Sequence, residues 1–189
     1  LDYSSPGSHH LGNYAPYALS AMNGIVCVGT LRSAGHLNNL NAGLREFHFI
    51  EDTCFATNND KRVRFPTSIA DRNVVTVDYK QVSPNIQIAN TNVNDVAMTV
   101  LPTAPIDEIS GLPRPTIAVA TLTGPCIIRD DDKTVTDGGD TQSISDIHIS
   151  KDNRLYFTFT GFDQAREVSH PDYWTQEGFF GSHQFASGE

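Results

Sequence analysis

The sequence has little of what helical and nucleic-acid-binding proteins use. Only four of its 189 residues are lysine and six are glutamate, although these residue types normally supply the exposed faces of helices. Lysine and arginine number 13 against 22 aspartate and glutamate residues, which gives a formal net charge of −9. A surface of that sign repels phosphate backbones and anionic lipid. We therefore expect few helices and no nucleic-acid partner.

Long hydrophobic runs and an obvious leader are also missing. Aliphatic stretches such as residues 25–28 reach only four or five residues, whereas a membrane-spanning helix needs about 20. We therefore expect no membrane insertion. The chain begins at Leu1 without a basic-then-apolar segment, so we expect a processed chain or a fragment of a longer one.

Motifs of high specificity for catalysis are absent from the sequence. It has no Gly-x-Ser-x-Gly, no glycine-rich phosphate loop, and no pair among its seven histidines at zinc-ligand spacing. We therefore expect no cofactor. We also expect His48 and His148, each between apolar neighbours in a strand, to face solvent or to be hydrogen-bonded.

The three cysteines are odd in number and have no short spacing. Cys27 and Cys126 lie in apolar, strand-like runs, where a thiol usually behaves as a small buried hydrophobe. We expect this for both residues. The alternative is one disulfide between strands, drawn from Cys27, Cys54 and Cys126, with one thiol left over.

What the sequence does have is typical of an all-β protein. Threonine, valine, isoleucine and the aromatic residues number 60, and these types favour a pleated sheet. Glycine, proline, asparagine and aspartate number 53, or 28% of the chain, and these residues form turns. We therefore predict short strands joined by many turns.

Two patterns repeat along the chain. Strand-like runs occur at 24–30, 73–79 and 115–121, and residues 26–30 match residues 117–121, which lie 91 positions later. A second motif at 93–99 matches 144–150, with Asp95 and Asp146 at its third position and a fainter copy at 14–20. We expect both aspartates to close turns. The spacing favours a repeat of about 45 residues.

The best-defined unit runs from residue 117 to residue 160. It reads as four antiparallel strands with a first turn around residues 124–125. We place these strands at 117–121, 126–130, 144–150 and 155–160. A four-stranded meander of this length is typical of a β-propeller blade, which buries its apolar face against the next blade.

The stretch 111–121, continuing through 126–132 and 144–156, resembles the blades of YVTN-type and related β-propellers. In those repeats an I-A-V-A-T strand, here residues 117–121, precedes a strand ending in an Asp-rich turn and later a D-x-R-L-Y turn, here 152–156. The sequence of this stretch is similar to propeller repeats in structural, tail-associated proteins of marine tailed bacteriophages. This chain departs from the pattern at 122–125, which replace a Gly-Gly pair, and at 31–43, an insertion.

The resemblance implies antiparallel four-stranded blades, either as a small four-bladed ring or as part of a larger one. A β-sandwich is the alternative, because it also uses short strands with regular turns. We expect an irregular lead-in at 1–13, a propeller-like domain of about three to four blades at 14–161, and an aromatic, glycine-rich tail at 162–189.

Two groups of residues are candidate sites. Acidic side chains bracket one hairpin and, with flexible glycines, can wrap a calcium ion, although a solvated turn is the simpler interpretation. They are Asp130, Asp132, Asp137 and Asp140. Aromatic side chains in the tail are candidates for contact with a partner. They are Tyr173, Trp174, Phe179 and Phe180.

The function predicted from these features is a non-enzymatic structural or binding module in a phage virion, a phage tail or another extracellular assembly. The expected partner is a protein or glycan surface, including other copies of the chain or other virion proteins. The alternative is a propeller-fold enzyme of the lactonase, lyase or glycosidase type. Its site would lie in the central channel and would use acids such as Asp95 and Asp146 from equivalent strands.

Overall fold

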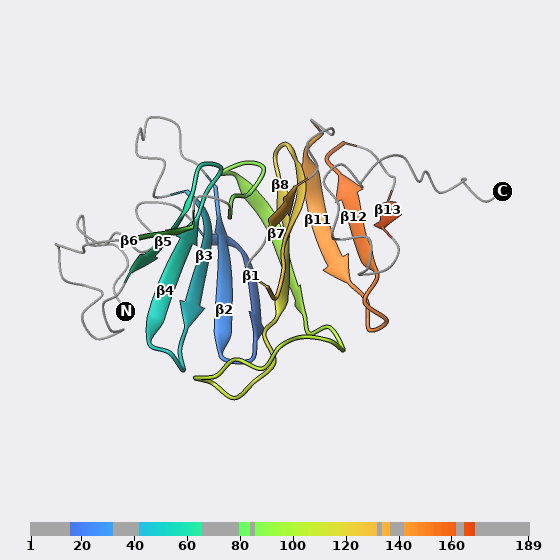
Figure 1. Ribbon diagram of the computed structural model, residues 1–189. Coiled ribbons are helices and arrows are strands. Elements are labelled where there is room, and N and C mark those ends of the chain that lie inside the picture. The colour runs from blue at the N-terminus through green and yellow to red at the C-terminus, as the bar shows by residue number, and fades with distance from the viewer. Residues whose placement is uncertain are drawn as a thin grey trace.

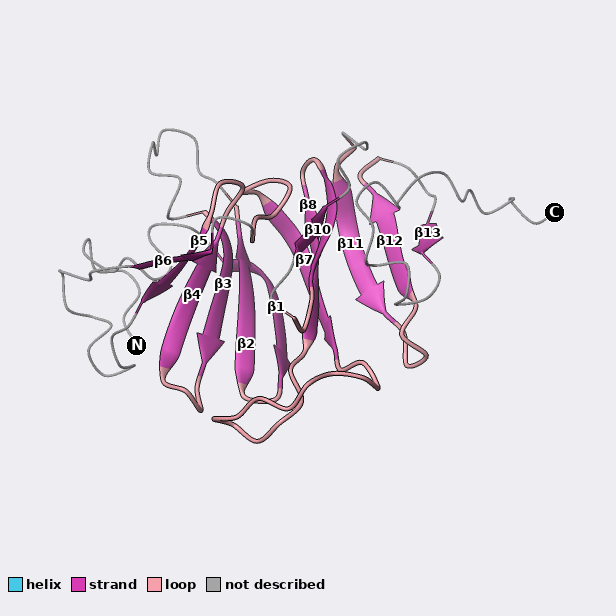
Figure 2. Cartoon of the chain, in the orientation of Figure 1, coloured by secondary structure: helices cyan, strands magenta, loops and turns pink. Residues whose placement is uncertain are grey.

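The computed structural model describes residues 16–31, 42–65, 80–83, 86–131, 134–136, 142–161 and 165–168. Over these ranges the chain folds into β-strands and the loops between them, in three antiparallel sheets (Figures 1 and 2). The all-β prediction is confirmed. In this part of the chain no helix is long and apolar enough to cross a membrane.

Each sheet follows the order of its strands in the sequence. Sheet 1 contains β1 (Pro16–Met22), β2 (Ile25–Thr30), β3 (Gly43–His48), β4 (Thr53–Thr57), β5 (Arg62–Phe65) and β6 (Lys80–Ser83). Sheet 2 contains β7 (Val93–Thr99), β8 (Thr116–Thr121), β9 (Gly124–Ile128) and β10 (Thr134–Thr136). Sheet 3 contains β11 (Ile144–Ile149), β12 (Leu155–Phe159) and β13 (Ala165–Val168).

Sheet 2 is the middle layer and is buried on both faces. Alternate residues of a strand point to opposite faces, so Ile117 and Val119 of β8 pack towards sheet 1 while Ala118 and Ala120 pack towards sheet 3. All six residues of β8 are buried. This explains why its sequence is a continuous run of apolar and small residues rather than an alternating one.

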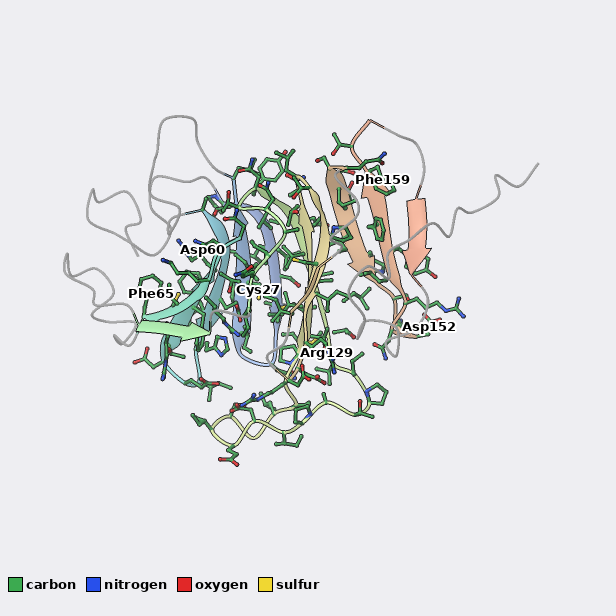
Figure 3. All side chains as sticks on the ribbon, turned by 45° about the horizontal axis from the view of Figure 1, so that its top comes forward. Cys27, Asp60, Phe65, Arg129, Asp152 and Phe159 are labelled. Carbon is green, nitrogen blue, oxygen red and sulfur yellow. The ribbon has the colours of Figure 1, made fainter. Side chains whose placement is uncertain are left out.

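The two cores on either side of sheet 2 differ in the size of their side chains. The core towards sheet 1 mixes aliphatic residues with two cysteines, and Cys27, labelled in Figure 3, lies within it. In the core towards sheet 3, Phe157 and Phe159 pack edge to face with ring centroids 5.5 Å apart. They share that core with the two alanines of β8, which leave room for large rings.

Sheets 1 and 2 approach each other closely at a glycine. A Cβ atom added to Gly29 in β2 would lie 2.5 Å from Cγ1 of Val93 in β7, well inside the contact distance of two carbon atoms. Only glycine therefore fits at this point without movement of the neighbouring strand.

The first strands of the three sheets lie next to one another, since β7 packs against β1 on one side and β11 on the other (Figure 1). All three carry the same irregularity. Their pairing with the second strand of the sheet shifts at Pro16/Ala18, Val93/Asp95 and Ile144/Asp146. A bulge at the same place in each first strand identifies these strands as structural equivalents.

Side chains of β7 bond directly to β11. Oδ2 of Asp95 accepts a hydrogen bond of 2.9 Å from the backbone N–H of Ile147, and the side-chain amide of Asn94 donates one of 2.6 Å to the carbonyl of Ile144. The expectation that Asp95 and Asp146 close turns is wrong, because both lie in bulged strands. Asp146 is exposed and accepts a hydrogen bond of 3.0 Å from the hydroxyl of Thr158 in its own sheet.

The unit expected at 117–160 crosses a boundary between sheets. Two of its strands, β8 and β9, belong to sheet 2, whereas β11 and β12 belong to sheet 3. The meander of sheet 2 begins one strand earlier, at β7, which the long connection 100–115 separates from β8. The first turn lies at 122–123, not 124–125, and β10 was not predicted.

The matched motifs fall on equivalent strands, but the repeat of about 45 residues is not reproduced, because the first strands of the sheets begin at residues 16, 93 and 144 and the sheets differ in strand number. The runs at 24–30 and 115–121 correspond to β2 and β8, both second strands of their sheets, and the motifs at 93–99 and 144–150 correspond to β7 and β11. The fainter copy at 14–20 is out of register by two residues, because the bulge aligns Pro16 with Val93. The run at 73–79 and the lead-in at 1–13 lie outside the described residues.

The boundary expected between the β domain and the tail, at residue 161, does not coincide with the end of the last sheet. Residues 165–168, which we assigned to the tail, form β13 and pair with β12. Over the described residues the three sheets form an open stack that does not close on itself.

All three cysteines are free and buried. Cys27 and Cys126 lie in the core between sheets 1 and 2, as small hydrophobes, which confirms the first interpretation of these residues; Cys54 lies in a third core on the other face of sheet 1. Burial raises the pKa of Cys126 to about 12 and, with the nearby charge of Glu46, raises that of Cys27 well above its usual value.

We expect the three thiols to be inert in the folded chain. Burial shields all three thiols from a reagent, and the raised pKa of Cys27 and of Cys126 leaves little reactive thiolate at those two positions. A colourimetric disulfide reagent at pH 8 should therefore report almost no thiol from these positions in native buffer and three thiols in denaturant. Rapid native reaction would contradict this arrangement.

Substitution of Asp95 tests the bond between sheets 2 and 3. Asp95→Ala leaves the N–H of Ile147 without its acceptor, and we expect a loss of about 2 kcal/mol in the free energy of unfolding. Asp146→Ala, at the equivalent exposed position, should cost under about 0.5 kcal/mol. Urea denaturation of both variants measures the difference, and equal losses would contradict the assignment.

Candidate functional site

A cavity of about 410 Å³ lies between sheets 1 and 2. Its sheet 1 wall comes from the turn between β1 and β2 and from β3, β4 and β5, and its sheet 2 wall from the ends of β8 and β9. The connection between β7 and β8, residues 100–115 and here called the lobe, lines a further side. The cavity therefore depends on segments that are distant in sequence.

The lobe is held in place by its own hydrogen bonds and by one bond to sheet 1. Oδ1 of Asp107 accepts hydrogen bonds from the backbone N–H groups of Ile109 (3.0 Å) and Ser110 (2.8 Å). Those bonds, the one from Ser110 above all, together with Arg114 lower the pKa of Asp107. The side-chain amide of Asn23, in the turn between β1 and β2, donates a hydrogen bond of 2.7 Å to the carbonyl of Pro113.

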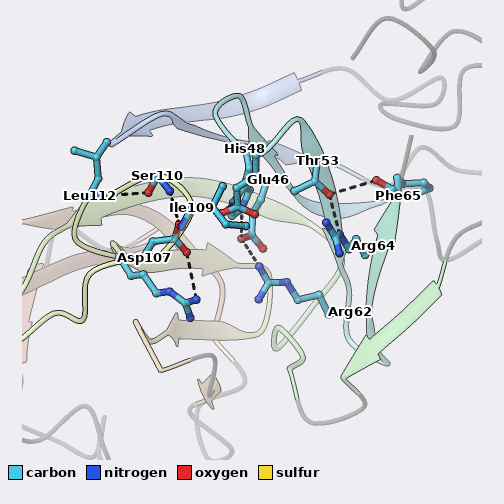
Figure 4. Close-up of polar contacts among 12 residues, drawn as sticks. Glu46, His48, Thr53, Arg62, Arg64, Phe65, Asp107, Ile109, Ser110 and Leu112 are labelled. Atoms are coloured by element: carbon cyan, nitrogen blue, oxygen red, sulfur yellow. Dashed lines mark hydrogen bonds and ion pairs between the residues drawn. The ribbon is translucent and has the colours of Figure 1, made fainter. Parts of the chain in front are cut away.

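Glu46 is the charged group at the centre of the sheet 1 wall. It lies on β3 opposite Cys27 and Phe55, is 1% exposed, and its Oε2 lies 2.6 Å from Nη2 of Arg62 (Figure 4). Burial alone raises the pKa of Glu46, but the Arg62 charge, with the neighbouring His48 and Thr57, outweighs burial and holds it below its ordinary value of 4.5.

His48 stands between two carboxylates. Its Nε2 lies 3.6 Å from Oε2 of Glu46 and its Nδ1 lies 3.5 Å from Oε1 of Glu51. The side chain is 12% exposed and its ring meets Phe55 edge to face at 5.0 Å. His148 is exposed, as expected. His48 is largely buried and contacts the two carboxylates rather than solvent.

Arg62 is held by an aromatic ring as well as by Glu46. Its guanidinium carbon lies 4.3 Å from the centroid of Phe55, within the range of a cation–π contact. The nearly buried guanidinium group is therefore stabilised by a carboxylate on one side and by an aromatic ring on another. Phe55 thereby links Arg62 to His48 in one cluster of charged and aromatic groups.

The acidic hairpin reaches the cavity through one of its predicted residues. Asp130 lines the cavity, and burial together with the nearby Asp131 raises its pKa. Arg129 pairs with Asp131 at 3.2 Å. Among the described residues no group of three or more side chains could hold a metal ion. Asp132, Asp137 and Asp140 lie outside the described residues, so the calcium site stays a prediction.

The aromatic contact residues predicted in the tail also lie outside the described residues. They are Tyr173, Trp174, Phe179 and Phe180. Sequence reasoning missed the cluster of Glu46, His48 and Arg62. The available signal was the spacing of Glu46 and His48, which lie two residues apart and therefore share one face of β3.

Comparisons with known proteins do not identify a family. No protein-family model matches the chain, and no curated protein matches it significantly. One solved structure with some similarity is the extracellular domain of a hybrid two-component system from B. thetaiotaomicron, with 14% sequence identity and a TM-score of 0.33. The alignment covers 82% of this chain and 22% of that chain, so this chain spans about a fifth of its length.

Separate loss of Glu46 or Arg62 should destabilise the fold far more than loss of both. Glu46→Gln leaves a buried guanidinium without its anion, and we expect a cost of about 3–5 kcal/mol at pH 7, much of it recovered in the double variant Glu46→Leu/Arg62→Met. Asp60→Asn, which breaks an exposed pair with Lys61, is the control and should change stability by under about 0.5 kcal/mol.

The destabilisation caused by Glu46→Gln should depend on pH. The pKa of Glu46 in the folded chain lies below its ordinary value, so the ionised Glu46 stabilises the fold above pH 4.5. This contribution is lost as the pH falls through the folded-state pKa. The stability difference between the natural chain and Glu46→Gln should therefore narrow below pH 4.5. Chemical denaturation from pH 7 to pH 3 measures it. A difference that stays constant would contradict the role of the ionised pair.

Proposed function

We propose that the chain is a non-enzymatic binding or assembly module built from consecutive blades of the β-propeller type. The observation that carries this proposal is the bulge at the same position in β1, β7 and β11. Each bulged strand begins an antiparallel meander, and each packs against the next. Blades of a propeller repeat in this way, each burying a face against its neighbour.

The enzyme alternative loses its main candidates in this arrangement. It relies on acids from equivalent strands, and Asp95 and Asp146 do occupy equivalent positions. Asp95, however, already accepts hydrogen bonds from the backbone of Val96 and Ile147. An acid used in this way holds two sheets together, which supports a structural role.

The ends of the stack offer surfaces for a partner. On β1, Tyr17 and Leu19 are 64% and 68% exposed, and on β11 the exposed Asp146 and His148 lie on the face of sheet 3 that does not meet sheet 2. We propose that these strands contact other copies of the chain or other proteins of the assembly. An extracellular or virion setting accords with the acidic composition and with the resemblance to phage propeller repeats.

Sedimentation of the purified chain tests this proposal. We expect association that rises with concentration, because blade faces bury apolar surface against each other, and we expect Leu19→Asp to weaken it at least about tenfold. Leu122→Asp is the control, since Leu122 is an exposed residue (44%) in the turn between β8 and β9. A chain that stays monomeric, or equal effects of the two variants, would contradict the assigned contact surface.

A further inference from the structure

The cavity between sheets 1 and 2 has the volume of a ligand site and an apolar mouth. Its volume of about 410 Å³ falls in the range of about 300–1,000 Å³ typical of small-molecule sites. Ile50 and Ile109 line it although they are 49% and 69% exposed, so they lie where the cavity opens to solvent. Ile50 lies over the turn between β1 and β2, since a Cβ atom added to Gly24 would be 2.7 Å from its Cδ1 atom. An apolar group of a ligand can therefore displace water at this mouth.

The three arginines that line the cavity each have a carboxylate beside them. The pairs are Arg62 with Glu46 at 2.6 Å, Arg114 with Asp107 at 3.3 Å, and Arg129 with Asp131 at 3.2 Å. A ligand carboxylate or phosphate would have to compete with these anions for the guanidinium groups. For the buried pair at Glu46, separation of the two charges is strongly unfavourable. An anionic ligand is therefore disfavoured.

Two carboxylates of the cavity lining remain outside these pairs, those of Asp130 and Glu51. Among the described residues no cation forms an ion pair with Asp130, because Arg129, labelled in Figure 3, pairs with Asp131 instead. Burial and the Asp131 charge raise the pKa of Asp130, and they outweigh the opposite effect of Arg129. Glu51 lies 3.5 Å from His48, which carries a charge only when it is protonated. At least one carboxylate of the lining, that of Asp130, would therefore be stabilised by a further cation.

We infer that this cavity binds a small organic ammonium ion, with the charged group at Asp130 and an apolar body at the mouth formed by Ile50 and Ile109. The ammonium group supplies the positive charge that Asp130 lacks and donates hydrogen bonds to its carboxylate oxygens. The apolar body removes the two exposed isoleucine side chains from water. The inference goes beyond the proposed assembly role, because it uses the interior between sheets 1 and 2 and not the outer strands of the stack.

Saturation-transfer NMR titrations at pH 7 with matched probes test the inference. Benzylamine, benzyl alcohol and phenylacetate share an aromatic body and differ in charge, and hexylamine, hexanol and hexanoate form a second set. We expect the amine of at least one set to bind about tenfold more tightly than its neutral and anionic analogues. Methylammonium, which has the charge without the apolar body, should bind at least about tenfold more weakly than that amine. No binding of either amine, or equal binding of an analogue or of methylammonium, would overturn the inference.

Two pairs of variants distinguish the cavity from a general attraction of cations to an acidic chain. Asp130→Asn removes the carboxylate and should weaken amine binding at least about tenfold. Glu108→Gln makes the same change in net charge at an exposed lobe residue that does not line the cavity, and it should leave binding unchanged. Ile50→Ser removes apolar surface from the mouth and should weaken binding about tenfold. Leu122→Ser, at an exposed residue outside the cavity, is its control.

The far-ultraviolet circular dichroism spectrum of each variant separates loss of binding from loss of folding. If Asp130→Asn unfolds, the comparison of Ile50→Ser with Leu122→Ser still decides the case. Amine binding that is equal within either pair of folded variants would overturn the site. Sedimentation of the same samples reports the assembly role independently, so failure of one proposal is distinguishable from failure of the other.

Discussion

Burial of sheet 2 on both faces is the constraint on which the rest of the structure depends. The strand β8 places its aliphatic side chains in one core and its alanines in the other. Removal of apolar surface from water is the main favourable contribution to folding, and here one sheet contributes to two cores. Sheets 1 and 3 thereby acquire fixed neighbours, and the cavity acquires its second wall.

Polar contacts decide how the sheets align once they are packed. The bulge in β7 directs Asp95 and Asn94 towards the backbone of β11. Apolar packing is non-directional, whereas a hydrogen bond between a carboxylate and one backbone amide is compatible with only one register. Strands β1 and β11 carry a bulge at the equivalent position, but Asp146 of β11 bonds within its own sheet.

The paired charges at the cavity follow from the same packing. Glu46 would be costly to bury alone. Arg62 reaches it from β5, across the intervening strand β4, and His48 reaches it from its own strand. The lobe adds the pair of Asp107 and Arg114. A cation beside each of these two carboxylates offsets the cost of removing its charge from water.

The sequence by itself determined the all-β class, the buried cysteines at 27 and 126, and the strands at 24–30 and 115–121, because β-branched runs between turn residues depend on local preference. It could not assign strands to sheets: a 16-residue connection separates β7 from β8, so the sequence pattern predicts one unit at 117–160, although this stretch divides between two sheets. Only the tertiary structure brought Glu46, His48 and Arg62 together with the lobe, since a cavity is formed by segments that meet only after the sheets pack.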